Sequence, residues 1–196
     1  SIRRQRQMCI RDRSKNEKLN TLFADSTSIS NLDVTNNPNL EQLSCSNTGL
    51  MELDVTHNPQ LVTLDIGDTK VKTLDISKNP NLKQLSCYMT NIAELDVTKN
   101  TKLTRLFCHD TTIKKLDLSN NLELEMLRCG EIFEQGIRGL DISKNTKIKK
   151  LICDDLYWLN VGENKVLENN HAFVGNGYID IKGNLSLIHI SEPTRR

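Results

Sequence analysis

The sequence lacks the patterns that mark helical domains and common catalytic or metal sites. No stretch repeats hydrophobic residues at helical spacing over three turns, and no Cys-x-x-Cys pair occurs. The first absence argues against a helical domain, and the second argues against a zinc site. A phosphate-binding loop and metal-ligand spacing are also missing. We therefore expect no enzyme activity, no metal and no cofactor within these 196 residues.

The two ends of the chain do not continue the pattern that lies between them. Residues 1–13 read SIRRQRQMCIRDR, and residues 185–195 read LSLIHISEPTR. Both segments resemble in-frame translations of a pair of sequencing adapters. We therefore interpret 1–13 and 185–196 as adapter-like scars outside the fold. The alternative is a natural basic arm and an apolar tail.

This interpretation changes the charge of the chain. The two end segments hold seven Arg against two acidic residues, so 19 Lys and Arg and 23 Asp and Glu remain. The net charge therefore changes from +1 to −4. The remaining chain has no basic stripe, and we expect no nucleic-acid partner. We also expect no direct membrane insertion.

Between the ends the chain repeats one unit. Its first residue recurs every 21 residues, and a seventh copy begins 24 residues after the sixth: Leu19, Leu40, Leu61, Leu82, Leu103, Leu124 and Ile148. Each unit contains the phrase L-x-x-L-x-L-x-x-N twice, as in residues 82–90 and 92–100. A fixed period of this length predicts a solenoid, in which neighbouring coils cover each other's hydrophobic residues.

Within each unit, hydrophobic and polar residues alternate in L-x-C and L-D-V, which indicates short strands. Asn-Pro pairs at 37–38, 58–59 and 79–80 indicate turns. We predict a β-rich, right-handed solenoid of about seven coils with short parallel strands and little or no α-helix, spanning residues 14–164. The extra residues Glu131–Gly136 must bulge from the sixth coil. Residues 165–184 are interpreted as a cap or the start of another domain.

The doubled phrase resembles bacterial leucine-rich-repeat proteins whose short unit nests two phrases, over roughly Leu19 to Leu167. The resemblance implies a non-catalytic module that binds a protein or glycan, in a bacterial surface or secreted protein. The alternative is the recognition domain of an effector or enzyme whose catalytic part lies outside this chain. Residues 14–16 align with the end of a unit, 77–79, so we interpret the chain as an internal fragment.

Four residue types recur in register. Five cysteines occupy the inward position of the first strand: Cys45, Cys87, Cys108, Cys129 and Cys153. Vertically adjacent cysteines have Cα atoms within disulfide range, but parallel strands hold their Cβ atoms about 4.8 Å apart whereas a disulfide prefers about 3.8 Å, so we expect the five to be buried and reduced. The second half of each unit carries an asparagine: Asn37, Asn58, Asn79, Asn100, Asn121, Asn145 and Asn164. The resemblance implies that these side chains bond backbone groups of adjacent coils.

In the first half, threonine holds the equivalent place: Thr27, Thr48, Thr69, Thr90 and Thr111. An outward aspartate ladder follows the second-half leucine: Asp33, Asp54, Asp75, Asp96, Asp117 and Asp141. Stacked like charges are unfavourable. Ser or Thr two residues later can donate hydrogen bonds to these aspartates and so reduce the repulsion. The alternative is that bound calcium reduces it.

The outward positions of the first strand vary most, and copies four to six concentrate aromatic and arginine residues there. Such residues are enriched where proteins bind partners. The candidate binding residues are Tyr88, Arg105, Phe107, His109 and Arg128. The alternative is a scatter of ordinary surface residues. Cys108 and His109 are strand neighbours that point to opposite faces, so they cannot act as a nucleophile–base pair.

Overall fold

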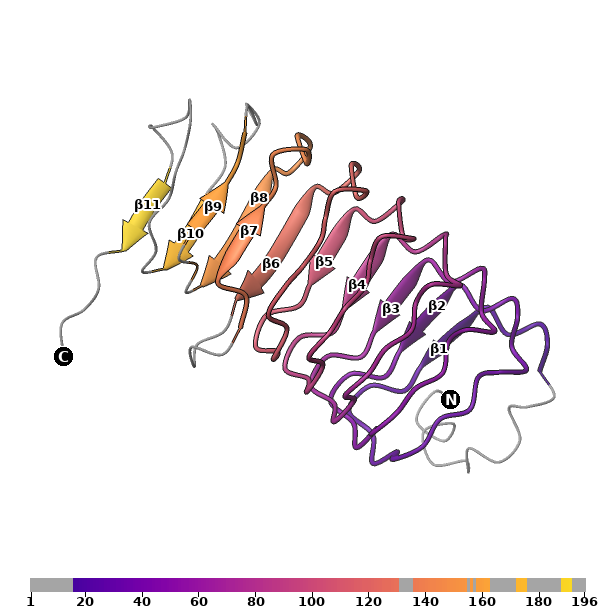
Figure 1. Ribbon diagram of the computed structural model, residues 1–196. Coiled ribbons are helices and arrows are strands. Elements are labelled where there is room, and N and C mark those ends of the chain that lie inside the picture. Colours follow the sequence, from indigo (N-terminus) through magenta and orange to yellow (C-terminus); the bar gives the residue numbers. More distant parts are fainter. Residues whose placement is uncertain are drawn as a thin grey trace.

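The repeated units fold into coils that stack along one axis (Figure 1). The computed structural model describes residues 16–130, 136–154, 156, 158–162, 172–175 and 188–191. Within these ranges all regular structure is β-strand and every strand pairing is parallel. The predicted β-solenoid is therefore confirmed. The described part contains no helix long and apolar enough to cross a membrane.

The first halves of the coils form one nine-stranded sheet with the order β1-β2-β3-β4-β5-β6-β8-β10-β11. Its first six strands are β1 (Thr21–Phe23), β2 (Gln42–Ser44), β3 (Thr63–Asp65), β4 (Gln84–Ser86), β5 (Arg105–Phe107) and β6 (Met126–Gly130). Neighbouring strands pair with an offset of 21 residues, as Leu85 with Leu106. The sequence period is therefore the register of the sheet.

The register changes where the sequence gains residues. β6 pairs with β8 (Lys150–Asp154) at an offset of 24, so Leu127 lies beside Leu151. The predicted bulge at 131–136 lies outside the described residues except for Gly136. The second halves of the last coils form a two-stranded sheet from β7 (Gly139–Asp141) and β9 (Trp158–Asn160).

The large sheet continues beyond the regular repeats. β10 (Ala172–Gly175) pairs with β8, and β11 (Ile188–Ser191) pairs with β10. β10 lies in the segment interpreted as a cap, and β11 lies in the adapter-like segment 185–196. The domain boundaries at residues 13, 164 and 184 stay predictions.

Inward side chains of all coils form one continuous core. The first-half leucines are completely buried from the second coil onward: Leu40, Leu43, Leu61, Leu64, Leu82, Leu85, Leu103, Leu106, Leu124 and Leu127. Burial of each such side chain contributes about 1.5–3 kcal/mol. Each of these first six strands thus has a buried leucine flanked by outward residues, most of them half-buried or exposed, which fixes what the outer face can display.

Asparagine side chains join adjacent coils. Asn79 is fully buried, and its Nδ2 donates to the carbonyl oxygens of Val55 and Asn58, both at 2.9 Å. The same pair of bonds recurs at Asn58, Asn100, Asn121 and Asn145. Each amide thus satisfies backbone acceptors in the preceding coil, as the resemblance implied.

Threonine closes the turn after each first strand. The Oγ1 of Thr90 donates to the carbonyl of Cys87 at 2.7 Å, and Thr27, Thr48, Thr69 and Thr111 repeat this bond. The residue before each threonine has a positive φ of 52–54°: Ser26, Asn47, Asp68, Met89 and Asp110. This conformation reverses the chain out of the strand, and asparagine and aspartate tolerate it better than methionine does.

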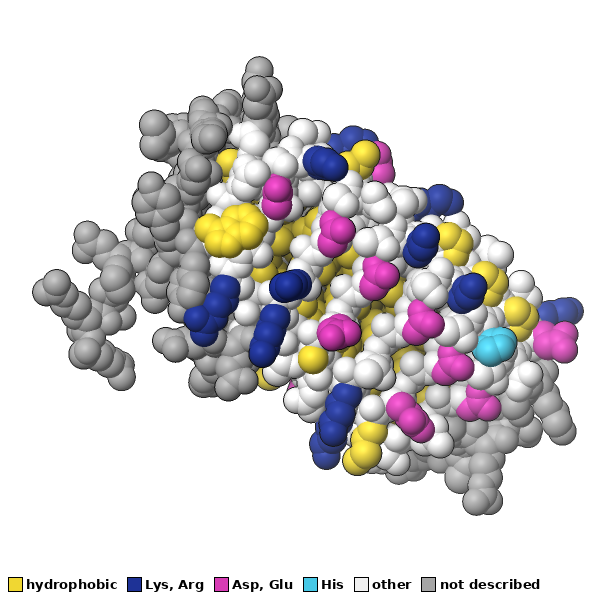
Figure 2. Space-filling view, viewed as in Figure 1, with side chains coloured by type: hydrophobic (Ala, Val, Ile, Leu, Met, Phe, Trp, Pro, Cys, Tyr) yellow, Lys and Arg dark blue, Asp and Glu magenta, His cyan; other side chains and the backbone are white. Residues whose placement is uncertain are grey.

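The aspartate ladder is held by local hydrogen bonds. Asp54 Oδ1 accepts from the backbone N–H of Thr56 at 2.8 Å and from its Oγ1 at 2.7 Å. The backbone bond recurs at Asp33, Asp75, Asp96, Asp117 and Asp141. These hydrogen bonds hold the pKa of each carboxyl below its usual value. Figure 2 shows acidic side chains following one another along the stack, with hydrophobic atoms visible between them.

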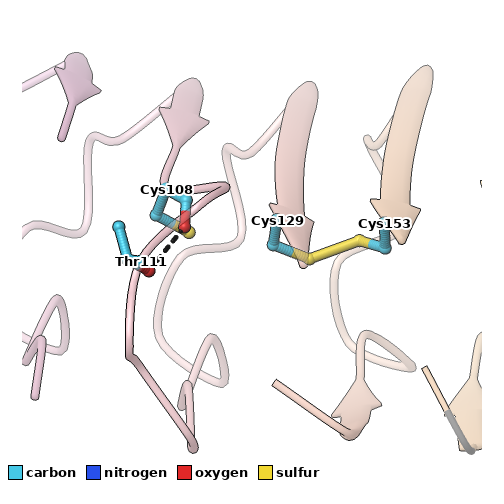
Figure 3. Close-up of a disulfide and its surroundings, with 4 residues drawn as sticks. All are labelled: Cys108, Thr111, Cys129 and Cys153. Carbon is cyan, nitrogen blue, oxygen red and sulfur yellow. Dashed lines mark hydrogen bonds between the residues drawn. A yellow bond between two sulfur atoms is a disulfide. The ribbon is translucent and has the colours of Figure 1, made fainter. Parts of the chain in front are cut away.

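The cysteine ladder corrects one expectation. Cys45, Cys87 and Cys108 are buried free thiols, but Cys129 and Cys153 form a disulfide (Figure 3). Their Cα atoms are 4.7 Å apart because the two residues are direct register partners of β6 and β8. That separation lies within the range of disulfides. Strand spacing alone therefore does not prevent the bond, and the prediction that all five cysteines are reduced was wrong.

Candidate binding surface on the strand face

The strand face consists of the outward side chains of β1–β6 and β8 and of the turns that follow them. On this face the register places Phe107 between Ser86 and Arg128. Arg105 lies two residues from Phe107 on the same strand. Arg105 and Arg128 are exposed, and Phe107 is half-buried. Ser86, Phe107 and Arg128 therefore form one column across β4, β5 and β6.

Two of the predicted residues form a ring pair. The rings of Tyr88 and His109 stack, with centroids 5.1 Å apart and planes inclined by 9°. The Tyr88 ring also extends back over Gly67 in the preceding coil, where an added Cβ would lie 2.7 Å from Tyr88 Cδ1. Such a contact is too close for any side chain. Glycine at position 67 is therefore what allows the ring to lie flat against the sheet.

His109 is held as a neutral ring. Its side chain is only 11% exposed, and Nδ1 has no hydrogen-bond partner among the described residues. Burial lowers the pKa of His109, and the Arg128 charge lowers it further, whereas Asp110, 4.0 Å from Nε2, raises it. The net shift is downward from 6.5. At neutral pH His109 thus contributes an aromatic surface rather than a charge.

Carboxylates gather on the side of Tyr88 that faces the N-terminal coils. Asp25 accepts hydrogen bonds from the Ser44 hydroxyl and from the N–H and hydroxyl of Ser46, the latter two at 3.0 Å. Asp65 accepts from the Gly67 N–H at 2.9 Å. Burial raises the pKa of Asp65, and the charge of Asp25 adds to that effect.

These carboxylates also act on the tyrosine. Burial raises the pKa of the Tyr88 phenol, and the charges of Asp65, Asp68 and Asp25 raise it further. None of the three carboxylates forms an ion pair among the described residues. The sequence prediction of the site omitted all three. The 21-residue period could have found Asp25, because residues 25, 67, 88 and 109 occupy one position of the unit.

The opposite end of the strand face is basic. Arg105 and Arg128 form no ion pair within the described part of the chain, and Lys150 of β8 is exposed in register with Met126. The neighbouring Glu125 is paired with Lys149 at 3.1 Å. The strand face therefore carries unpaired acids at one end, unpaired bases at the other, and the Tyr88–His109 ring pair between them.

The cysteine next to His109 is not an activated nucleophile. Cys108 is 1% exposed, and burial raises the pKa of its thiol to about 12. Its sulfur lies in the core, whereas His109 stacks on Tyr88 at the surface. Within the described ranges no group of three His, Cys, Asp or Glu side chains could hold a metal ion.

Another exposed aromatic residue lies away from the strand face. Trp158 of β9 is 51% exposed and covers Gly139 of β7, where an added Cβ would lie 2.6 Å from Trp158 Cζ2. This contact repeats the relation of Tyr88 to Gly67 on the smaller sheet. The sequence prediction of the site did not include Trp158, which is an alternative contact residue for a partner that does not bind the strand face.

Comparison with known proteins assigns the fold. No protein-family model and no curated protein matches the sequence. Among solved structures, the functional domain of InlJ from Listeria monocytogenes, described as including a cysteine ladder, is 25% identical with a TM-score of 0.55. A leucine-rich-repeat protein of Leptospira interrogans is 18% identical with a TM-score of 0.70. Internalin C2 from Listeria monocytogenes is 16% identical with a TM-score of 0.65.

The coverage of these matches is unequal. They include 91%, 85% and 85% of this chain. This chain spans 55%, 45% and 74% of the InlJ, Leptospira and internalin C2 chains, respectively. The chain thus has the leucine-rich-repeat solenoid fold of bacterial proteins, over about half the length of the first two.

Proposed function

We propose that the chain is a non-catalytic binding module that holds a protein partner on its strand face. The contact residues in this proposal are Tyr88, Arg105, Phe107, His109 and Arg128. The observation that carries it is the stacked Tyr88–His109 pair, flanked on both sides by charged groups without ion-pair partners in the described chain. Aromatic and arginine side chains in such a setting are typical anchors of protein interfaces.

A protein partner is favoured over a glycan by the charges. Both signs of ionised group are present on the strand face, and protein surfaces supply complementary groups of both signs. The disulfide between Cys129 and Cys153 supports a location outside the cytoplasm, at the cell surface or in secreted form, because disulfides persist in oxidising compartments.

A displayed library of random dodecapeptides, selected against the full chain, tests the proposal. Selected peptides should bind the double variant Arg105→Ala with Phe107→Ala at least tenfold more weakly, since a buried anchor contributes about 2 kcal/mol or more. The thermal midpoint of this variant should stay close to that of the parent, because Arg105 is exposed and Phe107 only half-buried.

Two variants on other surfaces serve as controls. Asp75→Asn changes the aspartate ladder, and Trp158→Ala removes the rival exposed aromatic ring. Both should leave peptide binding unchanged. If the selected peptides bind the strand-face double variant normally and lose affinity for either control, the strand face is the wrong surface.

A further inference from the structure

Apart from Asp110, which lies against His109, the acidic and basic side chains of the strand face are separated along the axis of the stack. Asp25, Asp65 and Asp68 belong to the first three coils, whereas Arg105 and Arg128 belong to the fifth and sixth. Hydrogen bonds orient Asp25 and Asp65 without neutralising them, because every donor is a hydroxyl or a backbone N–H. Like charges held together without counter-ions are unfavourable in the free protein. A partner that supplies the counter-charges would relieve this repulsion.

The register gives the distance between the two charged ends. Asp65, Ser86, Phe107 and Arg128 are successive register partners in β3, β4, β5 and β6. Three strand spacings separate Asp65 from Arg128, which is about 14 Å. The Tyr88–His109 pair lies in the turns that follow β4 and β5, the two strands between them. A ligand that contacts all three regions must therefore display three groups over about 14 Å.

An extended peptide matches this spacing. At about 3.3 Å per residue, side chains four residues apart are about 13 Å apart, and residues i, i+2 and i+4 point to the same side. A helix covers about 14 Å in roughly nine residues, which is about two and a half turns and places the end residues on opposite sides. An extended segment thus fits this spacing more directly than a helix does.

We propose that the partner presents an extended segment with Lys or Arg at one position and Asp or Glu four residues away. The basic side chain lies against Asp25, Asp65 and Asp68, and the acidic one against Arg105 and Arg128. The side chain midway between them contacts the Tyr88–His109 pair. This inference rests on the proposed binding function of the strand face and specifies the chemistry of the partner.

The test uses the peptides selected against the full chain. Their sequences should contain Lys or Arg and Asp or Glu four residues apart, in either direction, more often than the unselected library does. Selection against the triple variant Asp25→Asn, Asp65→Asn, Asp68→Asn should abolish the enrichment of the basic residue alone. Asparagine retains the Oδ1 acceptor that Ser44, Ser46 and Gly67 use, so the fold should survive.

The complementary variant, Arg105→Gln with Arg128→Gln, should abolish the enrichment of the acidic residue alone. A peptide carrying both charges should bind the Asp→Asn triple variant and the Arg→Gln double variant each about tenfold more weakly than the parent at low ionic strength. This difference in affinity between variant and parent should shrink in 1 M salt, where charges are screened beyond about 3 Å. Melting curves for each variant confirm that it is folded.

The outcomes separate the two proposals. Peptides that depend on Phe107 but show no paired charges would overturn the charge-pair inference and leave the binding surface intact. Peptides that are indifferent to all strand-face variants would overturn both. Binding to an array of neutral glycans, lost with Phe107→Ala and unaffected by the charge variants, would also overturn the inference in favour of a carbohydrate partner.

Discussion

Removal of one ladder asparagine should destabilise the protein far more than removal of a half-buried asparagine in the same coil. In Asn79→Ala two hydrogen bonds disappear, to the carbonyl oxygens of Val55 and Asn58. Each acceptor keeps a backbone bond, from the N–H of Asn58 and of Leu61 respectively, both at 3.1 Å. The substitution therefore removes two hydrogen bonds and leaves a small cavity. At about 0.5–1.5 kcal/mol for each bond, the free energy of unfolding should fall by about 2–3 kcal/mol.

Urea denaturation followed by circular dichroism measures this change. With a slope of about 2 kcal/mol per molar, the midpoint should fall by about 1 M or slightly more. Asn81→Ala is the matched control in the same coil, because Asn81 is only half-buried and its two hydrogen bonds lie at the surface. Its Nδ2 donates to the Pro59 carbonyl at 3.2 Å, and its Oδ1 accepts from Lys102 Nζ at 2.7 Å. The cost of Asn81→Ala should be below about 0.5 kcal/mol.

A second variant tests the direction of the hydrogen bonds. Asn79→Asp keeps the shape of the side chain but removes both N–H donors and places carboxyl oxygens against two carbonyls. It should therefore be less stable than Asn79→Ala. Equal stability of Asn79→Ala and Asn81→Ala would refute the inference that the buried amides hold adjacent coils together.

Three further perturbations test other parts of the fold. Met89→Asn should raise the free energy of unfolding by about 0.5–1 kcal/mol, because Met89 has a φ of 52° and asparagine tolerates that conformation; a lower thermal midpoint would contradict this reason. Cys129→Ser with Cys153→Ser should lower stability by about 3 kcal/mol through the released loop, and a non-reducing peptide map of the parent must show these residues cross-linked. Thr56→Val should raise the pKa of Asp54 towards 3.8, as measured by NMR titration. Since the folded-state pKa of Asp54 is lowered, its stabilisation is present above pH 3.8 and disappears as the pH falls through the folded-state pKa, so this variant should lose less stability on acidification.

The sequence predicts the features that depend only on the period. An offset of 21 residues fixes which side chains are neighbours in adjacent coils, and alternation fixes which of them point inward. The column of Ser86, Phe107 and Arg128 and the bonds of Asn79 follow from these two rules. In this repeat the local sequence pattern also predicts the tertiary contacts, because residues that contact each other between adjacent coils are one repeat unit apart in the sequence.

The features that the sequence missed depend on side-chain rotation and on turns. Strand spacing suggests that the Cβ atoms of Cys129 and Cys153 are too far apart for a disulfide, but it does not describe the side-chain rotation that brings their sulfur atoms together. Likewise, the period aligns Gly67 with Tyr88 without indicating that the tyrosine ring extends back over the glycine. Asp68 lies in a turn with positive φ, where alternation no longer applies.

The separation of buried core positions from outward positions explains how one scaffold can carry a specific surface. Leu106 is completely buried between equivalent leucines, whereas the next residue, Phe107, contributes to the strand face. Replacing a buried leucine by alanine costs about 2–5 kcal/mol, but an outward substitution away from special features costs about 0.5 kcal/mol or less. Outward residues can therefore differ from coil to coil at little cost in stability. The basic end, the ring pair and most of the acidic end of the strand face are consequences of that freedom, because they occupy positions that the core and the asparagine bonds do not constrain; Asp68 is the exception, since it takes the positive-φ position of a threonine turn.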